Sequence, residues 1–176
     1  LTAPASAERK AMEQGPIRIT AEETESKETG RYVEARGNVH VDYELDTGDT
    51  IHSISKFARY DQKEEFGELW GNPKAVWKRK DATQPDTALS AEKISLRVKG
   101  SELFASGNVE AVQSGRTLKA QEIRYYGVER KMVAETGRPA FFVQEPEHRV
   151  QISAENIVGW MDQREIQFRR KVKGSV

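Results

Sequence analysis

The sequence predicts an all-β protein, an elongated open β-jelly-roll trough of two facing antiparallel sheets built from about five bent hairpin repeats. Two observations predict this fold. A short phrase of the form small residue, spacer, Gly-Asn-Val occurs at residues 34–41 (EARGNVHV) and again at residues 104–111 (FASGNVEA). Around both copies apolar residues alternate with polar ones, which is the period of a half-buried strand.

The repeat extends well beyond this phrase. Three windows share one template of apolar or small residues without a gap. The first holds Ile19, Ala21, Thr24, Ser26, Val33, Ala35, Val39 and Val41, and the second holds Leu89, Ala91, Ile94, Leu96, Leu103, Ala105, Val109 and Ala111. The third holds Ile152, Ala154, Ile157, Gly159, Ile166, Phe168, Val172 and Gly174. Looser copies begin at Ile51 and Leu118, so five units follow one another roughly 30–40 residues apart.

Each unit is expected to be a β-hairpin with two bent arms. In the first arm the alternation slips by one residue, so the strand must bulge or turn there to keep its apolar side chains on one face. In the second arm Gly37 or Gly107 permits a positive φ and a second bend. Hairpins of this kind, placed side by side, form two sheets joined along the bends, with every second residue facing a shared cleft.

A helical alternative exists for two segments. Residues 21–28 (AEETESKE) and 90–98 (SAEKISLRV) contain good helix formers. A helix would group Ile94 with Val98 but leave Leu96 on the opposite side, so the recurring alternation favours strands. Residues 1–16 lack the alternation and are expected to be a flexible or short helical lead, with a helical turn at residues 6–14 before Gly15-Pro16. Residues 17–176 are expected to form a single domain.

Composition excludes several classes of protein. The 176 residues suffice for one domain, with 36% hydrophobic and 32% charged residues. Lys+Arg and Asp+Glu are both 28, so no net field favours nucleic acid. Without cysteine there is no disulfide, thiol nucleophile or Cys-ligated metal. No apolar run approaches 18 residues, so no membrane span or signal peptide is expected; the small-residue start suggests a mature terminus or the end of a removed anchor.

Catalytic and metal-binding patterns are missing from the sequence. His40, His52 and His148 stand in three different repeat contexts without metal-ligand spacing. No GxSxG, Walker or GxGxxG pattern occurs. The carboxylates of DQKEE (61–65) and DQREI (162–166) fall in expected hairpin turns, where turn chemistry explains them. The chain is therefore expected to be no enzyme and to need no cofactor or metal.

Taken together, ITAE…VEARGNVHV, LSAEKI…LFASGNVEA, LKAQEIRYY…VAETGRPAFF and ISAENI resemble the OstA-like family of lipopolysaccharide-transport proteins over roughly residues 17–176. Its members include LptA, the periplasmic domain of LptC and the N-terminal domain of LptD, and the residues do not decide among the three. The chain departs from the pattern in its looser second copy. It also departs in RRKVKG of the fifth copy, which has no Gly-Asn pair.

The resemblance implies a periplasmic β-jelly-roll trough that shields the lipid A acyl chains of lipopolysaccharide between the inner and outer membranes. It also implies head-to-tail stacking with other jelly-roll modules or with itself, which fits the unpaired strand edges expected at both ends. Membrane association would come through partners or a removed N-terminal anchor. Apolar walls can hold acyl chains without directional bonds, at roughly 0.8 kcal/mol per CH₂ removed from water, so the lipid could slide.

The groove-lining residues are expected at the inward apolar positions of the repeats. The predicted lipid-binding set is Ile19, Val33, Val39, Val41, Leu89, Ile94, Leu96, Leu103, Val109, Leu118, Ile123, Tyr125, Met132, Phe141, Ile152, Ile157, Ile166 and Phe168. The same side chains could instead seal a dry core. The rival function is accordingly a structural β-repeat protein that polymerises through its strand edges and carries no lipid.

Overall fold

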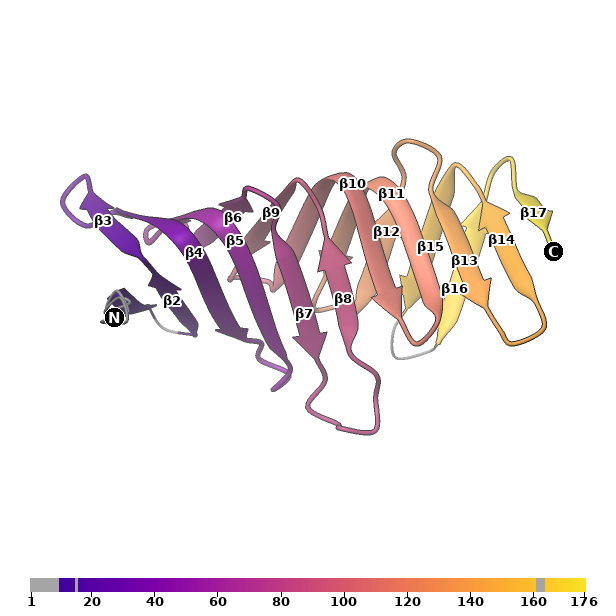
Figure 1. Ribbon diagram of the computed structural model, residues 1–176, viewed down its shortest axis with the longest axis horizontal. Coiled ribbons are helices and arrows are strands. Elements are labelled where there is room, and N and C mark those ends of the chain that lie inside the picture. The colour runs from indigo at the N-terminus through magenta and orange to yellow at the C-terminus, as the bar shows by residue number, and fades with distance from the viewer. Residues whose placement is uncertain (1–9, 15, 161–163) are drawn as a thin grey trace, which may run out of the picture.

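The computed structural model describes residues 10–14, 16–160 and 164–176. Within these ranges all regular secondary structure is β-strand. Figure 1 shows an elongated, two-layered molecule with β2 and β3 towards one end and β17 at the other. No helix in these ranges is long and apolar enough to cross a membrane. The strands are β1 (Lys10–Gln14), β2 (Ile17–Ala21), β3 (Glu23–Lys27), β4 (Tyr32–Glu44), β5 (Thr50–Asp61), β6 (Phe66–Trp70), β7 (Lys74–Lys78), β8 (Thr87–Ser90), β9 (Lys93–Arg97), β10 (Glu102–Gln113), β11 (Arg116–Tyr126), β12 (Lys131–Ala134), β13 (Ala140–Gln144), β14 (Arg149–Ser153), β15 (Asn156–Trp160), β16 (Glu165–Arg169) and β17 (Lys173–Ser175).

The hydrogen-bonded pairs form one folded-over, wholly antiparallel sheet of 17 strands. Its first layer, the first sheet, runs β1, β2, β4, β5, β7, β8, β10, β11, β13, β14, β17. Its second layer, the second sheet, runs β3, β4, β5, β6, β9, β10, β11, β12, β15, β16. The long strands β4, β5, β10 and β11 cross from one layer to the other. The predicted trough of two facing antiparallel sheets is thus confirmed.

The corners lie where the repeated phrase predicts them. Gly37 and Asn38 have φ values of 77° and 44°, and Gly107 with its following asparagine has 79° and 45°. The strand register shifts at both places, because two left-handed residues insert a bulge. Opposite each corner the first arm breaks its own alternation: the Glu22 amide donates to Gly37 O at 3.0 Å, and the Glu92 amide donates to Gly107 O at 2.9 Å.

The fifth corner forms without glycine. Arg170 and Lys171 take the left-handed conformation, with φ values of 63° and 44°. Left-handed backbone costs a non-glycine residue roughly 1–2 kcal/mol, so tertiary contacts must hold it. Glu155 supplies two of them, an amide hydrogen bond to Arg170 O at 3.0 Å and an ion pair with Lys171 at 2.9 Å. The segment RRKVKG therefore forms the same corner although it lacks the Gly-Asn pair.

The N-terminal prediction needs correction. Residues 10–14 form β1, which pairs antiparallel with β2, so a flexible or helical lead is wrong for these residues. The sheet therefore begins before residue 17, and residues 1–9 lie outside the described part. The helical alternative also fails for residues 21–28 and 90–98, which contribute to β2, β3, β8 and β9.

Candidate functional site

The N-terminal part of the trough is filled by its own side chains. Five predicted lining residues there are at most 3% exposed, namely Ile19, Val33, Val39, Ile94 and Val109. The space left between the sheets is a cavity of about 40 Å³. A single water needs about 10–15 Å³ on such a measure, so this space holds a few waters and no acyl chain. Burial raises the pKa of Tyr43 and of Tyr60, whose side chains lie in the same region.

An aromatic pair bridges the trough near its middle. Trp77 of the first sheet meets Tyr125 of the second edge to face, with ring centroids 4.3 Å apart. The indole N–H of Trp77 donates to the buried carboxylate of Asp49 at 3.1 Å. The same carboxylate accepts the Lys80 amide at 2.9 Å and lies 3.4 Å from the Arg79 guanidinium. These bonds anchor the bridge from the rim of the first sheet.

Beyond this bridge the sheets enclose a cavity of about 380 Å³, which we call the C-terminal cavity. Its volume lies within the roughly 300–1,000 Å³ typical of small-ligand sites. The first sheet contributes Ala111, Leu118 and Phe141, and the second sheet contributes Met132, Ile157, Gly159 and Ile166. The lining also includes Gln84, Ser114 and Arg164 from loops, so the cavity opens along the edge opposite the corners.

Three arginines stand among the lining residues of the C-terminal cavity. Arg79 is mostly buried beside Asp49, with 11% of its side chain exposed. Arg116 and Arg164 are exposed and accompanied by Glu165. Guanidinium groups bind phosphate and carboxylate through paired, charge-assisted hydrogen bonds. Apolar walls below guanidinium groups suit a molecule with an oily body and an anionic head.

The predicted lining residues divide into groups. Leu118, Met132, Phe141, Ile157 and Ile166 line the C-terminal cavity. Ile19, Val41, Ile94, Leu96 and Leu103 line only the 40 Å³ space. The others line neither cavity. The buried ones are Val33, Val39, Val109, Ile123 and Tyr125, and the half-buried ones are Leu89, Ile152 and Phe168. The ring centroid of Phe168 lies 5.9 Å from that of Phe141. Contact with lipid stays a prediction for all of them.

Sequence reasoning missed the three arginines and Trp77. Arg79, Arg116 and Arg164 lie at a strand end or in loops, and no spacing in the chain links them. Trp77 falls in the looser second repeat, whose register was the least defined. The signal that was available was Gly159, a small residue at a template position that other copies fill with a larger side chain. A missing side chain at an inward position indicates space.

Two of the histidines and one of the turn carboxylates lie among the described residues. His40 and His52 lie on the outer side of the first sheet, with Nδ1 of one 3.3 Å from Nε2 of the other. No cluster of three or more metal-ligating side chains occurs in the described ranges. Asp61 accepts hydrogen bonds from the Lys63 and Glu64 amides, which is turn chemistry, and from the Arg31 guanidinium, which lowers its pKa. Residues 161–163, including Asp162, lie outside the described part.

No protein-family model matches the chain, and no curated protein matches its sequence. A solved structure does match in fold: LptH, the LptA homologous periplasmic component of the conserved lipopolysaccharide transport device from Pseudomonas aeruginosa. The alignment covers 92% of this chain and 94% of LptH, with a TM-score of 0.54 and 12% sequence identity. Identity this low speaks for the fold alone. At that level the OstA-like resemblance is confirmed: the chain has the β-jelly-roll fold of an LptA-type transport component.

Proposed function

We propose that this chain is a periplasmic lipid-binding transport module that shields lipopolysaccharide acyl chains during transit from the inner to the outer membrane. The C-terminal cavity carries the proposal, because an apolar space of about 380 Å³ lies open within an LptA-type fold. Its role is to hold and pass on a lipid, so the module needs no catalytic residue or cofactor.

The energetics fit a sliding cargo. Each CH₂ that moves from water into the cavity contributes roughly 0.8 kcal/mol, and the apolar walls form no bond that fixes the chain in one place. In this proposal Arg116 and Arg164, which line the cavity, bind the phosphates of lipid A, and its acyl chains lie against Leu118 and Phe141. Binding is then strong enough to keep the chains out of water and uniform enough to release them.

The packed N-terminal part favours the second candidate, a structural β-repeat protein with a filled core. There the inner space is about 40 Å³, so an acyl chain enters only if the two sheets separate. In the transport reading this part opens transiently or joins the next module. In the structural reading it is the whole purpose of the fold, and the C-terminal cavity is a packing defect.

Stacking with further modules is the second element of the proposal. The outer edges of β3 and β16 in the second sheet and of β1 and β17 in the first have no strand partner among the described residues. Unpaired backbone groups at both ends suit head-to-tail addition of another jelly-roll module or a second copy. A continuous row of troughs would let the lipid cross a gap wider than one molecule.

Site-specific photo-crosslinking tests the lipid path. A photo-reactive residue at Ile157 or Ile166, in the C-terminal cavity, is expected to form adducts with lipopolysaccharide in cells. The same residue at Ile54, 44% exposed and outside the lining of either cavity, is the control and should form none. Equal labelling at Ile54 and Ile157 would contradict a lipid site inside the trough. Organic extraction of the purified protein separates the two candidates: co-purified lipid supports transport, whereas lipid-free filaments support the structural role.

A further inference from the structure

The two sheets match strand for strand except at β1. Along the trough, β2 of the first sheet corresponds to β3 of the second, and β7, β8, β13, β14 and β17 correspond to β6, β9, β12, β15 and β16. The long strands β4, β5, β10 and β11 belong to both sheets. Within the described ranges β1 alone has no counterpart, so the first sheet projects one strand beyond the second at the N-terminal end.

β1 occupies a place that a neighbouring repeat fills elsewhere. Inside the chain, the strand that opens a repeat pairs with the last strand of the preceding repeat, as β8 pairs with β7 through Leu89 and Ala75. β2 opens the first repeat, and β1 lies on that same side of it, with Met12 opposite Ile19. The last strand of the fifth repeat is β17, which uses one edge for β14 and has no described partner on the other. β1 and β17 of a second copy therefore suit the same edge of β2.

The second sheet supplies a register for such a junction. β6 pairs with β9 so that Leu69 faces Ile94, and β12 pairs with β15 at the equivalent template positions. The same register applied to β16 and to β3 of a second copy places Phe168 opposite Thr24. It places Gln167 opposite Glu25 and brings two pairs of opposite charge together, Arg169 with Glu23 and Glu165 with Lys27. Opposite charges facing each other across strands are stabilising.

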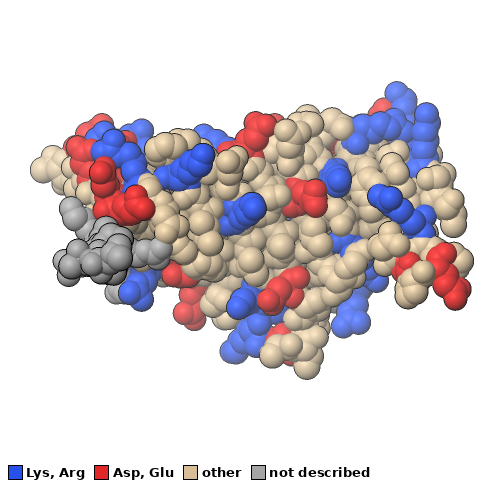
Figure 2. All heavy atoms as spheres, in the orientation of Figure 1, with Lys and Arg blue, Asp and Glu red and all other residues tan. Residues whose placement is uncertain are grey.

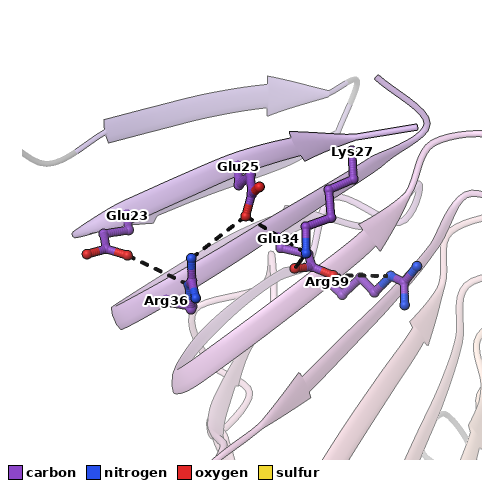
Figure 3. Close-up of polar contacts among 6 residues, drawn as sticks. All are labelled: Glu23, Glu25, Lys27, Glu34, Arg36 and Arg59. Atoms are coloured by element: carbon purple, nitrogen blue, oxygen red, sulfur yellow. Dashed lines mark ion pairs between the residues drawn. The ribbon is translucent and has the colours of Figure 1, made fainter. Parts of the chain in front are cut away.

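The charges at the two ends are complementary. Figure 3 shows Glu23, Glu25 and Lys27 on the outer side of β3, where Arg36 reaches Glu23 and Glu25 at 3.7 Å and Lys27 reaches Glu34 at 2.7 Å. At the other end Arg169, Arg170, Lys171 and Lys173 are all exposed, and Figure 2 shows basic side chains gathered at the end that carries β17 in Figure 1. Although the chain has no net charge, β3 carries two glutamates and one lysine, whereas basic side chains are in excess at the β16–β17 end.

We propose that β1 is a displaceable capping strand and that its competitor is β17 of a second copy. In the isolated chain β1 covers the first-sheet edge of β2, while the β3 edge stays available. On docking, β16 pairs with β3 in the register given above, β17 replaces β1 on β2, and both sheets continue unbroken into the next molecule. This inference rests on the head-to-tail stacking in the proposed function. It adds the strand register of the junction and the strand, β1, that regulates docking.

The capping role is tested by locking β1. Because the chain has no cysteine, Ala11→Cys with Thr20→Cys introduces one pair of directly opposed residues in β1 and β2. Sedimentation velocity should show only monomer after oxidation and concentration-dependent association after reduction. Met12→Pro, which weakens pairing of β1, should lower the apparent dissociation constant about tenfold, because a larger fraction of molecules is then competent to bind. Equal association of the locked and reduced protein would overturn the proposal.

The register is tested by a second cysteine pair at the two ends of the molecule. Gln167→Cys with Glu25→Cys in one chain should give a ladder of disulfide-linked copies. Gln167→Cys with Ser26→Cys, shifted by one residue onto the other face, should give none. Equal ladders from both variants, or no self-association by wild-type protein at millimolar concentration, would overturn the proposal. Lipid adducts at Ile157 would still stand in that case, so failure of docking and failure of lipid binding can be told apart.

Discussion

Filling the C-terminal cavity from within should weaken the proposed lipid binding while leaving the fold intact. Gly159 of β15 is the position for this test, because it lines the cavity and has no positive φ. A Cβ built there comes no closer than 3.9 Å to its nearest neighbour, the Glu165 carbonyl oxygen. Gly159→Leu therefore projects a side chain into open space without strain, in a strand where leucine fits better than glycine.

The magnitude follows from the carbons displaced. A leucine side chain adds four carbons and excludes up to about four acyl carbons from the cavity, and at roughly 0.8 kcal/mol each this loss is about 3 kcal/mol. Such a loss corresponds to roughly hundredfold weaker binding of lipid A. The thermal midpoint should stay level or rise, since the new methyl groups pack against Met132 and Ile157 instead of facing solvent.

Displacement of a fluorescent lipid A analogue, measured beside thermal unfolding by circular dichroism, checks both expectations. Gln151→Leu is the matched control, because it adds the same side chain at an exposed position of β14 outside the cavity lining and should leave affinity unchanged. A folded Gly159→Leu protein that binds lipid A as tightly as wild type would refute the assignment of the cavity as the lipid site.

Three further outcomes are expected. Gly107→Ala should lower the free energy of unfolding in urea by about 2–4 kcal/mol, because the new Cβ would lie 2.7 Å from Glu92 Cβ at a φ of +79°. The control Gly100→Ala, with a φ of +87° and its nearest neighbour at 4.0 Å, should cost only about 1–2 kcal/mol. Equal costs would argue against crowding at the corner. In the same assay Asp49→Ala should lower the free energy of unfolding by about 3 kcal/mol, because it removes the buried carboxylate that contacts Arg79 and the Trp77 indole. A cost below about 1 kcal/mol would contradict the anchoring role of Asp49. Arg31 lowers the pKa of Asp61 in the folded protein, so near pH 4 the unfolded chain binds more protons than the folded one. The stability that Asp61 contributes should therefore be full above this pH and fall below it. Urea unfolding midpoints from pH 3 to 6 check this, and Asp61→Asn should make the midpoint depend less steeply on pH.

Much of the architecture could be predicted because its determinants are local. Alternation of apolar and polar residues places Val33, Val39 and Leu103 on the inner face whatever lies opposite them. Gly37 and Gly107 mark corners because two consecutive left-handed residues are least costly with glycine in the first place. The strand edge at β1 had no such local signal, since residues 10–14 lack the two-residue period and gain their strand conformation from pairing with β2.

The sequence by itself determined the repeat, the all-β class, the corners at Gly37 and Gly107 and the alternation that turns every second side chain of a repeat inward. Only the tertiary structure decided which inward positions are sealed and which border open space. Whether Ile94 or Ile157 meets a neighbour depends on the residue across the trough, and that residue comes from a distant repeat at a distance set by the two sheets. Packing between the two sheets joins segments that are far apart in the sequence, so the pattern within one repeat does not predict it.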